Sequence, residues 1–501
     1  MKKSILILLS VMITMISCGQ KSIKKKVKQK PGHTIEFDIA GMPNAKLLVA
    51  YHYSGKHYIS DTIMLNEKGY GVLKGEEHKP KGVYLAVFPS LNNKYFEFLI
   101  SDQHFKISTS KEELGKKMGF TNSPENDIFN SDMLEMAELR TQSAELKNEL
   151  DTAKEKQKAV LKDQMEALNK TYLAKREKIM TDYPDFFYTD LLGLMKEVTI
   201  PEAPKNEAGE LIDSSFGWKY WKQHYWDYTD FSEEGILRTP IYHNKLMNFM
   251  SKRTEPIQDS VIRSCHLVLD KALANEEVFK YSLVTLLNKY ANSKIMGDDA
   301  VYVDLIDSYY KKGLASWTDS TQLAKMIERA DALAPLLIGK TSPDLTMRHT
   351  DLTTQIRLHD LPADYTIVFV WDPDCGHCKK AIPHIKRFYD TYGKDKDIMV
   401  YAISTVNYEQ VGEWKDFIKE HDLTWANVAD PYHETPFRKV YDISSTPQVY
   451  VLDNDKKIIA KRIGAEQLEE FFFNYFKRFD KEKFKGMEGL TFEAAVDSTK
   501  H

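Results

Sequence analysis

The stretch WDPDCGHC at residues 371–378 places two cysteines, Cys375 and Cys378, directly after the apolar run 367–370. Residues 366–371 are predicted to form a buried strand and residues 379–392 a helix. Cys375 is therefore expected at a strand-to-helix junction, where unpaired N–H groups and aligned peptide dipoles favour the thiolate over the thiol. Cys378, one turn further along, is placed to attack a mixed disulfide formed at Cys375. The spacing predicts a redox-active dithiol.

Two other uses of a CxxC pair fit this chain less well. A zinc site needs two further Cys or His ligands at suitable spacing, and the other cysteines, Cys18 and Cys265, do not form a second pair. Haem attachment needs a His directly after the second Cys, and Lys379 stands there. No metal site is therefore expected.

A Thr-Pro step lies about 70 residues after the cysteines, at Thr446 and Pro447, and leads straight into the apolar run 448–452 and a second predicted strand, 458–463. The segments between the cysteines and this step alternate in type: a strand at 398–403, a helix at 408–421, a short strand at 425–428 and a helix near 435–441. A closing helix is predicted at 466–476.

Residues 339–476 in this order resemble the thioredoxin-like domain of the TlpA/ResA type, which comprises membrane-tethered periplasmic thiol-disulfide oxidoreductases. The lead-in GKTSPDL at 339–345 and Pro383 within the predicted helix also match that family. The resemblance implies an α/β thioredoxin-like fold over residues 338–480 and a cis bond before Pro447. It also implies exchange with protein thiols and disulfides, and no cofactor beyond the dithiol. The alternative for Pro447 is a trans proline that merely begins a strand.

The resemblance also assigns roles to the residues around the dithiol. Cys375 attacks and Cys378 resolves, while a cis Pro447 would hold the backbone of Thr446 beside the sulfurs, open to pair with an extended partner segment. Thr446 and Trp371 are thus expected to bind the substrate, although Trp371 fits plain packing equally well.

Two familiar buried acids of these proteins are missing. The glutamate that usually stands three residues after the second cysteine is replaced by Ala381, and the buried acid of ordinary thioredoxins by Phe369. Proton transfer from Cys378 is therefore left to water, to His377 or to a residue that the sequence does not identify.

The CGHC tetrapeptide resembles that of protein disulfide isomerases. A histidine beside a thiolate stabilises the reduced form, so His377 predicts a reduction potential on the order of −200 mV, more oxidising than that of thioredoxin. The alternative for His377 is a solvent-facing residue with no influence on the potential.

The beginning of the chain predicts export. Lys2 and Lys3 precede a mostly apolar run at 4–16, which is too short to span a bilayer comfortably, and then Ser17-Cys18-Gly19. Residues 15–18 resemble a bacterial lipobox, which implies cleavage before Cys18 and lipidation of its sulfur. Residues 1–18 are thus expected to be a lipoprotein signal and 19–32 a basic tether. The mature chain is expected on the periplasmic side, anchored in the inner or the outer membrane.

The remaining chain is expected to form two further domains and a tail. Period-two alternation predicts a small antiparallel β-domain at 33–110. Three-four spacing predicts an all-α domain at 111–337, which includes a long helix or a helical hairpin over 139–172. Cys265 is expected to face its core as a small apolar residue. Residues 481–501 are expected to be a polar tail that ends in a loose segment. The net charge of −4 shows no bias towards nucleic acid.

Dense aromatic residues at 218–228 lie within the predicted helical domain, where core packing is the simpler use and a peptide or glycan groove the alternative. The region resembles a helical domain of unknown function that precedes thioredoxin domains, and 33–110 resembles the β-modules that accompany it. A binding lipoprotein with a supporting redox domain therefore remains an alternative function. A disulfide isomerase is a second, and a peroxiredoxin-type peroxidase is disfavoured because Asp372 replaces the Thr it needs.

Overall fold

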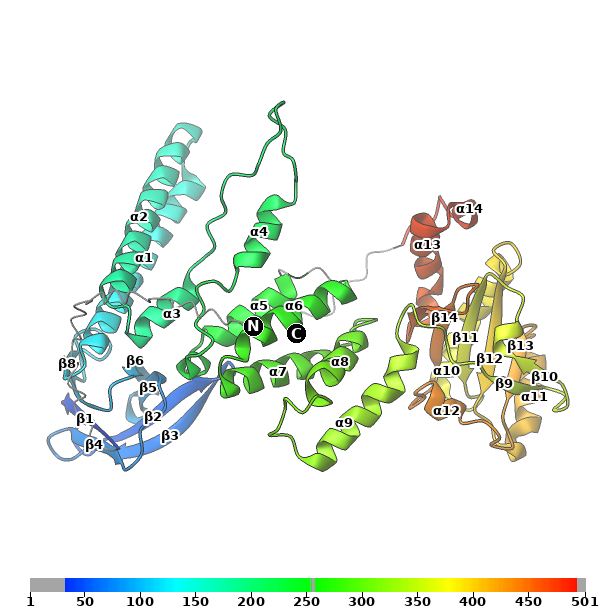
Figure 1. The fold of residues 1–501 in the computed structure, drawn as a ribbon, viewed down its shortest axis with the longest axis horizontal. Coiled ribbons are helices and arrows are strands. Elements are labelled where there is room, and N and C mark those ends of the chain that lie inside the picture. The colour runs from blue at the N-terminus through cyan, green and yellow to red at the C-terminus, as the bar shows by residue number, and fades with distance from the viewer. Residues whose placement is uncertain (1–31, 253, 255–256, 493–501) are drawn as a thin grey trace, which may run out of the picture. The chain divides into compact units, whose positions relative to one another are not determined.

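The structure is a computed structural model that describes residues 32–252, 254 and 257–492 (Figure 1). The chain divides into two compact units, with the boundary between Tyr188 and Thr189. None of the described helices is both long enough and apolar enough to cross a bilayer.

The first unit begins with two four-stranded sheets, in the orders β4-β1-β7-β8 and β3-β2-β5-β6. Their strands are β1 His33–Ala40, β2 Lys46–Tyr53, β3 Lys56–Met64, β4 Tyr70–Gly75, β5 Gly82–Phe88, β6 Lys94–Ile100, β7 His104–Ser110 and β8 Gly119–Thr121. The sheets are antiparallel except that β1 and β7 pair in parallel. Every second side chain of β1 is buried, including Ile35, Phe37 and Ile39, as the alternation of apolar and polar residues in its sequence predicts.

A helical hairpin, α1 Pro124–Thr152 and α2 Glu155–Asp182, completes the first unit. The buried side chain of Asn126 on α1 accepts from the N–H of Leu99 (2.7 Å) and donates to its carbonyl oxygen (2.9 Å), which ties α1 to β6. Arg176 on α2 pairs with the buried Asp132 at 2.9 Å. The hairpin thus belongs to the same compact unit as the sheets, and the division between the units falls after Tyr188 and not at the predicted domain boundary of 110/111.

The second unit begins with a set of helices. They are α3 Phe187–Met195, whose first two residues belong to the first unit, α4 Phe216–His224, α5 Tyr242–Lys252, α6 Gln258–Ala272, α7 Glu276–Ala291, α8 Asp299–Leu305 and α9 Ser320–Leu333. Cys265 on α6 is fully buried, and burial raises the pKa of its thiol, so the prediction of a core residue is confirmed. Within the aromatic segment 218–228, Trp226 is buried against Phe249, with ring centroids 5.4 Å apart, whereas Tyr228 is exposed.

A seven-stranded sheet in the order β10-β9-β13-β12-β11-β14-β15 forms the centre of the C-terminal domain. Its strands are β9 Thr346–His349, β10 Gln355–Arg357, β11 Tyr365–Trp371, β12 Ile398–Ser404, β13 Ala426–Ala429, β14 Gln448–Leu452 and β15 Ile458–Lys461. Its helices are α10 Gly376–Tyr392, α11 Val411–Glu420, α12 Phe437–Val440, α13 Leu468–Phe479 and α14 Lys481–Phe484. The predicted order of strands and helices is confirmed, with shifts of a few residues at their ends.

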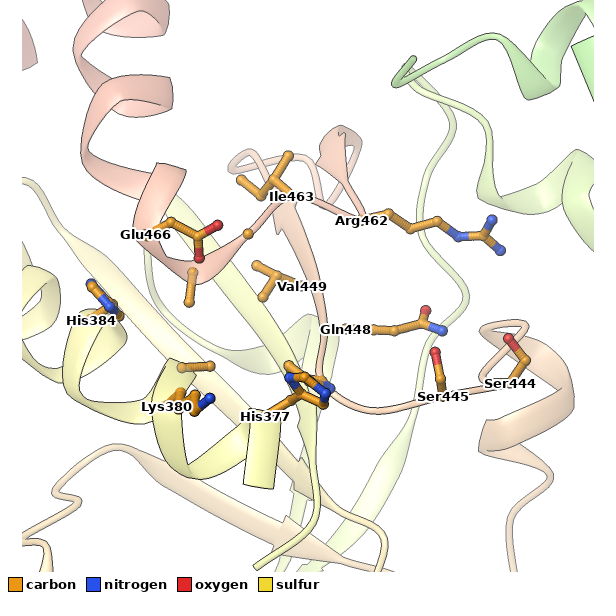
Figure 2. Close-up of a pocket in the computed structure, with 14 residues that line it drawn as sticks. His377, Lys380, His384, Ser444, Ser445, Gln448, Val449, Arg462, Ile463 and Glu466 are labelled. Carbon is orange, nitrogen blue, oxygen red and sulfur yellow. The ribbon is translucent and has the colours of Figure 1, made fainter. Parts of the chain in front are cut away.

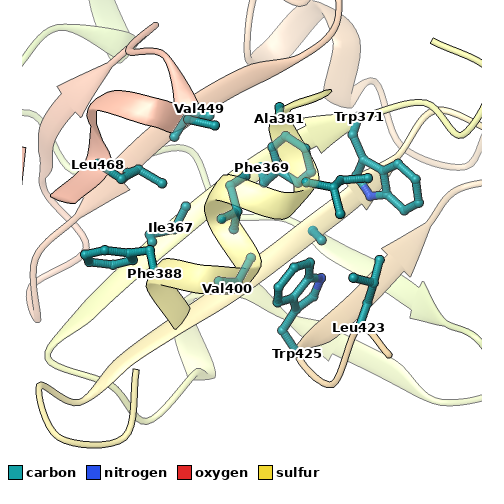
Figure 3. Close-up of a cluster of buried hydrophobic side chains, with 14 of the residues drawn as sticks. Ile367, Phe369, Trp371, Ala381, Phe388, Val400, Leu423, Trp425, Val449 and Leu468 are labelled. Carbon is teal, nitrogen blue, oxygen red and sulfur yellow. The ribbon is translucent and has the colours of Figure 1, made fainter. Parts of the chain in front are cut away.

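The central strand β11 is buried on both faces, so its residues form an unbroken apolar run. On one face, Ile367 and Phe369 pack against the apolar side of α10, as Figure 3 shows. On the other face, Val368 and Val370 pack against Phe437 of α12 and its surroundings. Within the predicted polar tail, α14 follows residue 480 and Met487 is fully buried.

Candidate active site

Cys375 is the residue that precedes α10, directly after the loop that leaves β11. Its φ of −76° and ψ of 117° are extended, and its side chain is half-buried. Its Sγ lies 3.5 Å from the carbonyl oxygen of Thr446. The strand-to-helix junction predicted from the sequence therefore brings the first cysteine to the start of a helix and beside the Thr-Pro step.

The helix start changes the acidity of Cys375. Burial alone raises the pKa of its thiol, but the backbone N–H groups of Cys378 and His377, together with Thr446, outweigh burial and hold the pKa below its usual value. These N–H groups belong to the first turn of α10, where backbone N–H groups have no carbonyl partner within the helix. A thiol of lowered pKa at an accessible position is the attacking partner in disulfide exchange.

Cys378 lies one turn further along α10 and is fully buried. Burial raises the pKa of its thiol to about 12, although the backbone N–H of Asp372, 3.4 Å from Sγ, acts in the opposite direction. The two thiols thus differ in both exposure and acidity, and this difference assigns the attack on a partner to Cys375 and the buried position to Cys378.

The peptide bond between Thr446 and Pro447 is cis. β14 begins at the next residue, and its Gln448 pairs with Val370 near the end of β11. The register of these antiparallel strands explains why a step 70 residues away in the sequence lies next to the cysteines.

A groove of about 570 Å³ adjoins the dithiol; we call it the active-site groove. His377, Lys380 and His384 line it from α10, and Figure 2 shows them facing the segment that carries Ile463 and Glu466. Its other lining residues are Ala381, Ser444, Ser445, Pro447, Gln448, Val449, Arg462, Gly464 and Ala465. Ser444, Arg462 and Glu466 were not predicted as site residues, because they lie about 70 to 90 residues after the cysteines in the sequence and belong to no motif.

Trp371 does not line this groove. Its side chain is 1% exposed and stacks on Phe369 with ring centroids 6.2 Å apart and an angle of 3° between the planes (Figure 3). Of the two expectations for Trp371, this position favours plain packing over substrate binding, because the side chain points into the core on the α10 face of the sheet. Thr446, in contrast, is half-buried at the dithiol.

The two positions at which related proteins carry an acid are occupied by apolar side chains that pack in the same cluster as Cys378. Ala381 and Phe369 are buried, apolar neighbours in the same cluster. The carboxylate of Asp372 is half-buried and accepts from the hydroxyl of Thr405 (2.7 Å) and from the N–H of Asp374 (2.8 Å). These two hydrogen bonds fix the loop at Asp372, and they keep the backbone N–H of Asp372 beside Sγ of Cys378.

The expected lipidation site Cys18 and the signal run 4–16 lie outside the described residues. Among residues 32–252, 254 and 257–492, no group of three or more His, Cys, Asp or Glu side chains is arranged to hold a metal ion.

Two protein-family models match the chain. The AhpC/TSA family matches residues 338–461, and a domain of unknown function, DUF5106, matches residues 196–332. The first match covers the domain that carries the dithiol, and the second covers most of the helices that precede it in the second unit.

Curated relatives match the same C-terminal region. The thiol-disulfide oxidoreductase ResA of Bacillus cereus is 29% identical over 134 residues, which are 26% of this chain and 73% of that protein. The sporulation thiol-disulfide oxidoreductase A of Bacillus subtilis is 34% identical over 110 residues, which are 21% of this chain and 65% of that protein. The chain thus spans just under two thirds of the length of the sporulation protein.

Solved structures that match include a domain of a possible thiol-disulfide isomerase from Cytophaga hutchinsonii. It is 41% identical, with a TM-score of 0.27 and coverage of 30% of this chain and 99% of that one. A thioredoxin-like protein from Bacteroides caccae is 18% identical, with a TM-score of 0.43 and coverage of 56% of this chain and 99% of that one.

The family match, the curated relatives, the fold and the geometry of the dithiol lead to one conclusion. The chain is a multidomain thiol-disulfide oxidoreductase, and its C-terminal thioredoxin-like domain is homologous to the ResA type.

Proposed function

We propose that the chain is a lipid-anchored, periplasm-facing enzyme that exchanges disulfides with protein substrates through Cys375 and Cys378. The observation that carries this proposal is the contrast between the half-buried Cys375, whose pKa is lowered, and the fully buried Cys378, whose pKa is raised to about 12. One cysteine is thus suited to meet a partner, and the other to react only within the protein.

In the reducing direction, the Cys375 thiolate attacks one sulfur of the partner's disulfide. A mixed disulfide forms and the partner's other sulfur leaves as a thiolate. Cys378 then loses its proton and attacks Sγ of Cys375, which releases the partner's second thiolate. The partner gains two electrons and the enzyme is left with a Cys375–Cys378 disulfide. The oxidising direction is the reverse, and neither needs a cofactor beyond the dithiol.

The neighbouring residues have supporting roles in this proposal. His377 lies on the solvent side of the first turn of α10 and raises the reduction potential, while Thr446 and Pro447 align the backbone of the partner. Trp371 has no part in binding and supports the core beneath the site. The resemblance of residues 15–18 to a lipobox supports the anchor at Cys18 and the periplasmic location.

The test is a redox titration of the full chain against glutathione, combined with reduction of insulin. We expect a potential on the order of −200 mV, no insulin reduction by Cys375→Ser, and a trapped mixed disulfide with Cys378→Ser. A dithiol that does not equilibrate with glutathione would refute the enzymatic proposal. Labelling of growing cells with an alkyne fatty acid, with Cys18→Ala as the control, tests the anchor separately.

A further inference from the structure

A second groove, of about 1180 Å³, lies between α9 and the C-terminal domain; we call it the α9 groove. Ala324, Ile327 and Pro335 line it from α9 and the turn that follows. Pro436, Val440 and Ile443 line it from α12 and its flanks. Figure 1 shows α9 alongside α12. Its walls thus combine a helix that precedes the thioredoxin-like domain with a helix of that domain.

The α9 groove and the active-site groove adjoin at one residue. Ser444 lines both of them, and it stands two residues before Thr446, whose carbonyl oxygen lies 3.5 Å from Sγ of Cys375. A polypeptide joined to Cys375 by a mixed disulfide and extended past Ser444 would therefore reach the α9 groove.

The helix that forms one wall is held in place by a buried lysine of the sheet. Lys461 on β15 is 4% exposed, and its Nζ donates to the carboxylate of Asp299 on α8 and to the carbonyl oxygen of Leu336 (2.7 Å), just after α9. α9 is fixed to α8 in turn, because the hydroxyl of Tyr302 donates to the carbonyl oxygen of Met326 at 3.2 Å. These contacts make the groove a built surface of the second unit.

The chemistry of the lining favours an apolar occupant. The charged side chains that line it are of both signs and nearly cancel, so charge contributes little to the choice of a partner. The basic ones are Lys325, Arg329, Arg438 and Lys439, and the acidic ones are Glu328, Asp331 and Asp442. Aliphatic and proline side chains form the remaining wall. Binding of an apolar side chain to this wall is favourable because it removes apolar surface of both partners from water.

We infer that the α9 groove binds an extended, apolar segment of the protein whose cysteine reacts at Cys375. This inference rests on the proposed disulfide exchange and adds the class of substrate. Apolar segments are buried in folded proteins, so a protein that offers one next to a reactive cysteine is unfolded or misfolded. The helices that precede the thioredoxin-like domain would thus select the substrate, while the dithiol reacts with it.

The test compares three substrates of the full chain: a small aromatic disulfide, and two 15-residue peptides that carry a central cysteine as a glutathione mixed disulfide. One peptide has Leu and Val around the cysteine, and the other has Ser and Gly. The groove variant is Ala324→Glu, which places a charge on an exposed position of the wall. The matched control is Gln322→Glu, which adds the same charge on the same helix at an exposed position outside the groove.

For the wild type, we expect kcat/KM to be at least about tenfold higher with the apolar peptide than with the Ser and Gly peptide. Burial of one or two aliphatic side chains in the groove is enough to give this difference. Ala324→Glu should remove that preference and leave the small disulfide unaffected, while Gln322→Glu should keep it. Equal rates for both peptides, a preference that survives Ala324→Glu, or an equal loss on all three substrates would overturn the inference. A wild type that is inactive on the small disulfide would instead refute the proposed function.

Discussion

The backbone N–H of Asp372 lies 3.4 Å from Sγ of Cys378, on the side of the dithiol that faces away from solvent. It is a hydrogen-bond donor beside a sulfur whose pKa burial raises to about 12. A donor stabilises a thiolate but accepts no proton, so deprotonation of Cys378 depends on the solution.

The resolving step should therefore depend steeply on pH. Below a pKa of about 12 the thiolate fraction of Cys378 grows about tenfold for each pH unit, so the rate should rise in the same proportion from pH 6 to pH 9. The measurement is stopped-flow release of a chromogenic thiol from a preformed mixed disulfide at Cys375. A rate that levels off near neutral pH would contradict this and would point to a general base.

Trp371→Phe should weaken the fold and leave the binding of substrate unchanged. The indole is buried against Phe369, so the smaller ring leaves a cavity, and the free energy of unfolding should fall by about 1–3 kcal/mol. Urea denaturation and KM for a peptide disulfide are the two measurements. An increase in KM with unchanged stability would return Trp371 to the binding site.

Replacing Lys461 should cost stability and also substrate preference. Lys461→Met leaves the carboxylate of Asp299 without its partner at a largely buried position, a change that typically costs about 3–5 kcal/mol. The second replacement, Asp299→Leu, should restore much of that loss. The preference for apolar peptides should weaken in the single variant, because the carbonyl oxygen of Leu336 also loses its donor and α9 its attachment.

Lys457→Met is the matched control for Lys461. Lys457 pairs with Asp455 at 3.1 Å in an exposed position, and such pairs contribute less than about 1 kcal/mol. The measurement is the free energy of unfolding in urea, for the two single variants and for the Lys461→Met, Asp299→Leu double variant. Equal losses for the Lys457 and Lys461 variants would show that the buried pair does not hold the two parts together.

Lys245 should make the stability of the second unit depend on pH. Its Nζ donates to the carbonyl oxygen of Leu194 at 2.8 Å, and burial lowers its pKa to about 8, below the value of 10.5 for a free lysine. Between these values the unfolded chain binds more protons than the folded one, so this contribution to stability rises with pH and is complete above the unfolded value. The difference in urea midpoint between wild type and Lys245→Met should grow in favour of the wild type from pH 7 to pH 10. A constant difference would contradict it.

The thioredoxin-like domain was predictable because its signals are local and agree with one another. The apolar run before Cys375, the amphipathic spacing after it and the Thr-Pro step before β14 each predict one element. The position of Trp371 was not predictable from pattern. A strand buried on both faces shows no period-two alternation, and without that period the sequence does not tell which side chains face the site.

The parts that the sequence did not predict depend on packing between distant segments. The hairpin of α1 and α2 shows helical periodicity, but that periodicity does not say that Asn126 will bond to a strand of the β-domain. Lys461 follows apolar residues in a strand, where a lysine ordinarily marks a solvent-facing position. Its burial depends on an acid more than 160 residues away in the chain, Asp299.

Lys461 and Arg462 stand next to each other in the chain, at the end of β15. Lys461 bonds to the helices that precede the domain, and Arg462 lines the active-site groove. A recombination event that joined residues 338–501 to an unrelated upstream segment would leave the ammonium of Lys461 facing a surface without its acid. The helices and the redox domain of the second unit are therefore expected to be inherited as a pair, with substitutions at positions 299 and 461 correlated among descendants.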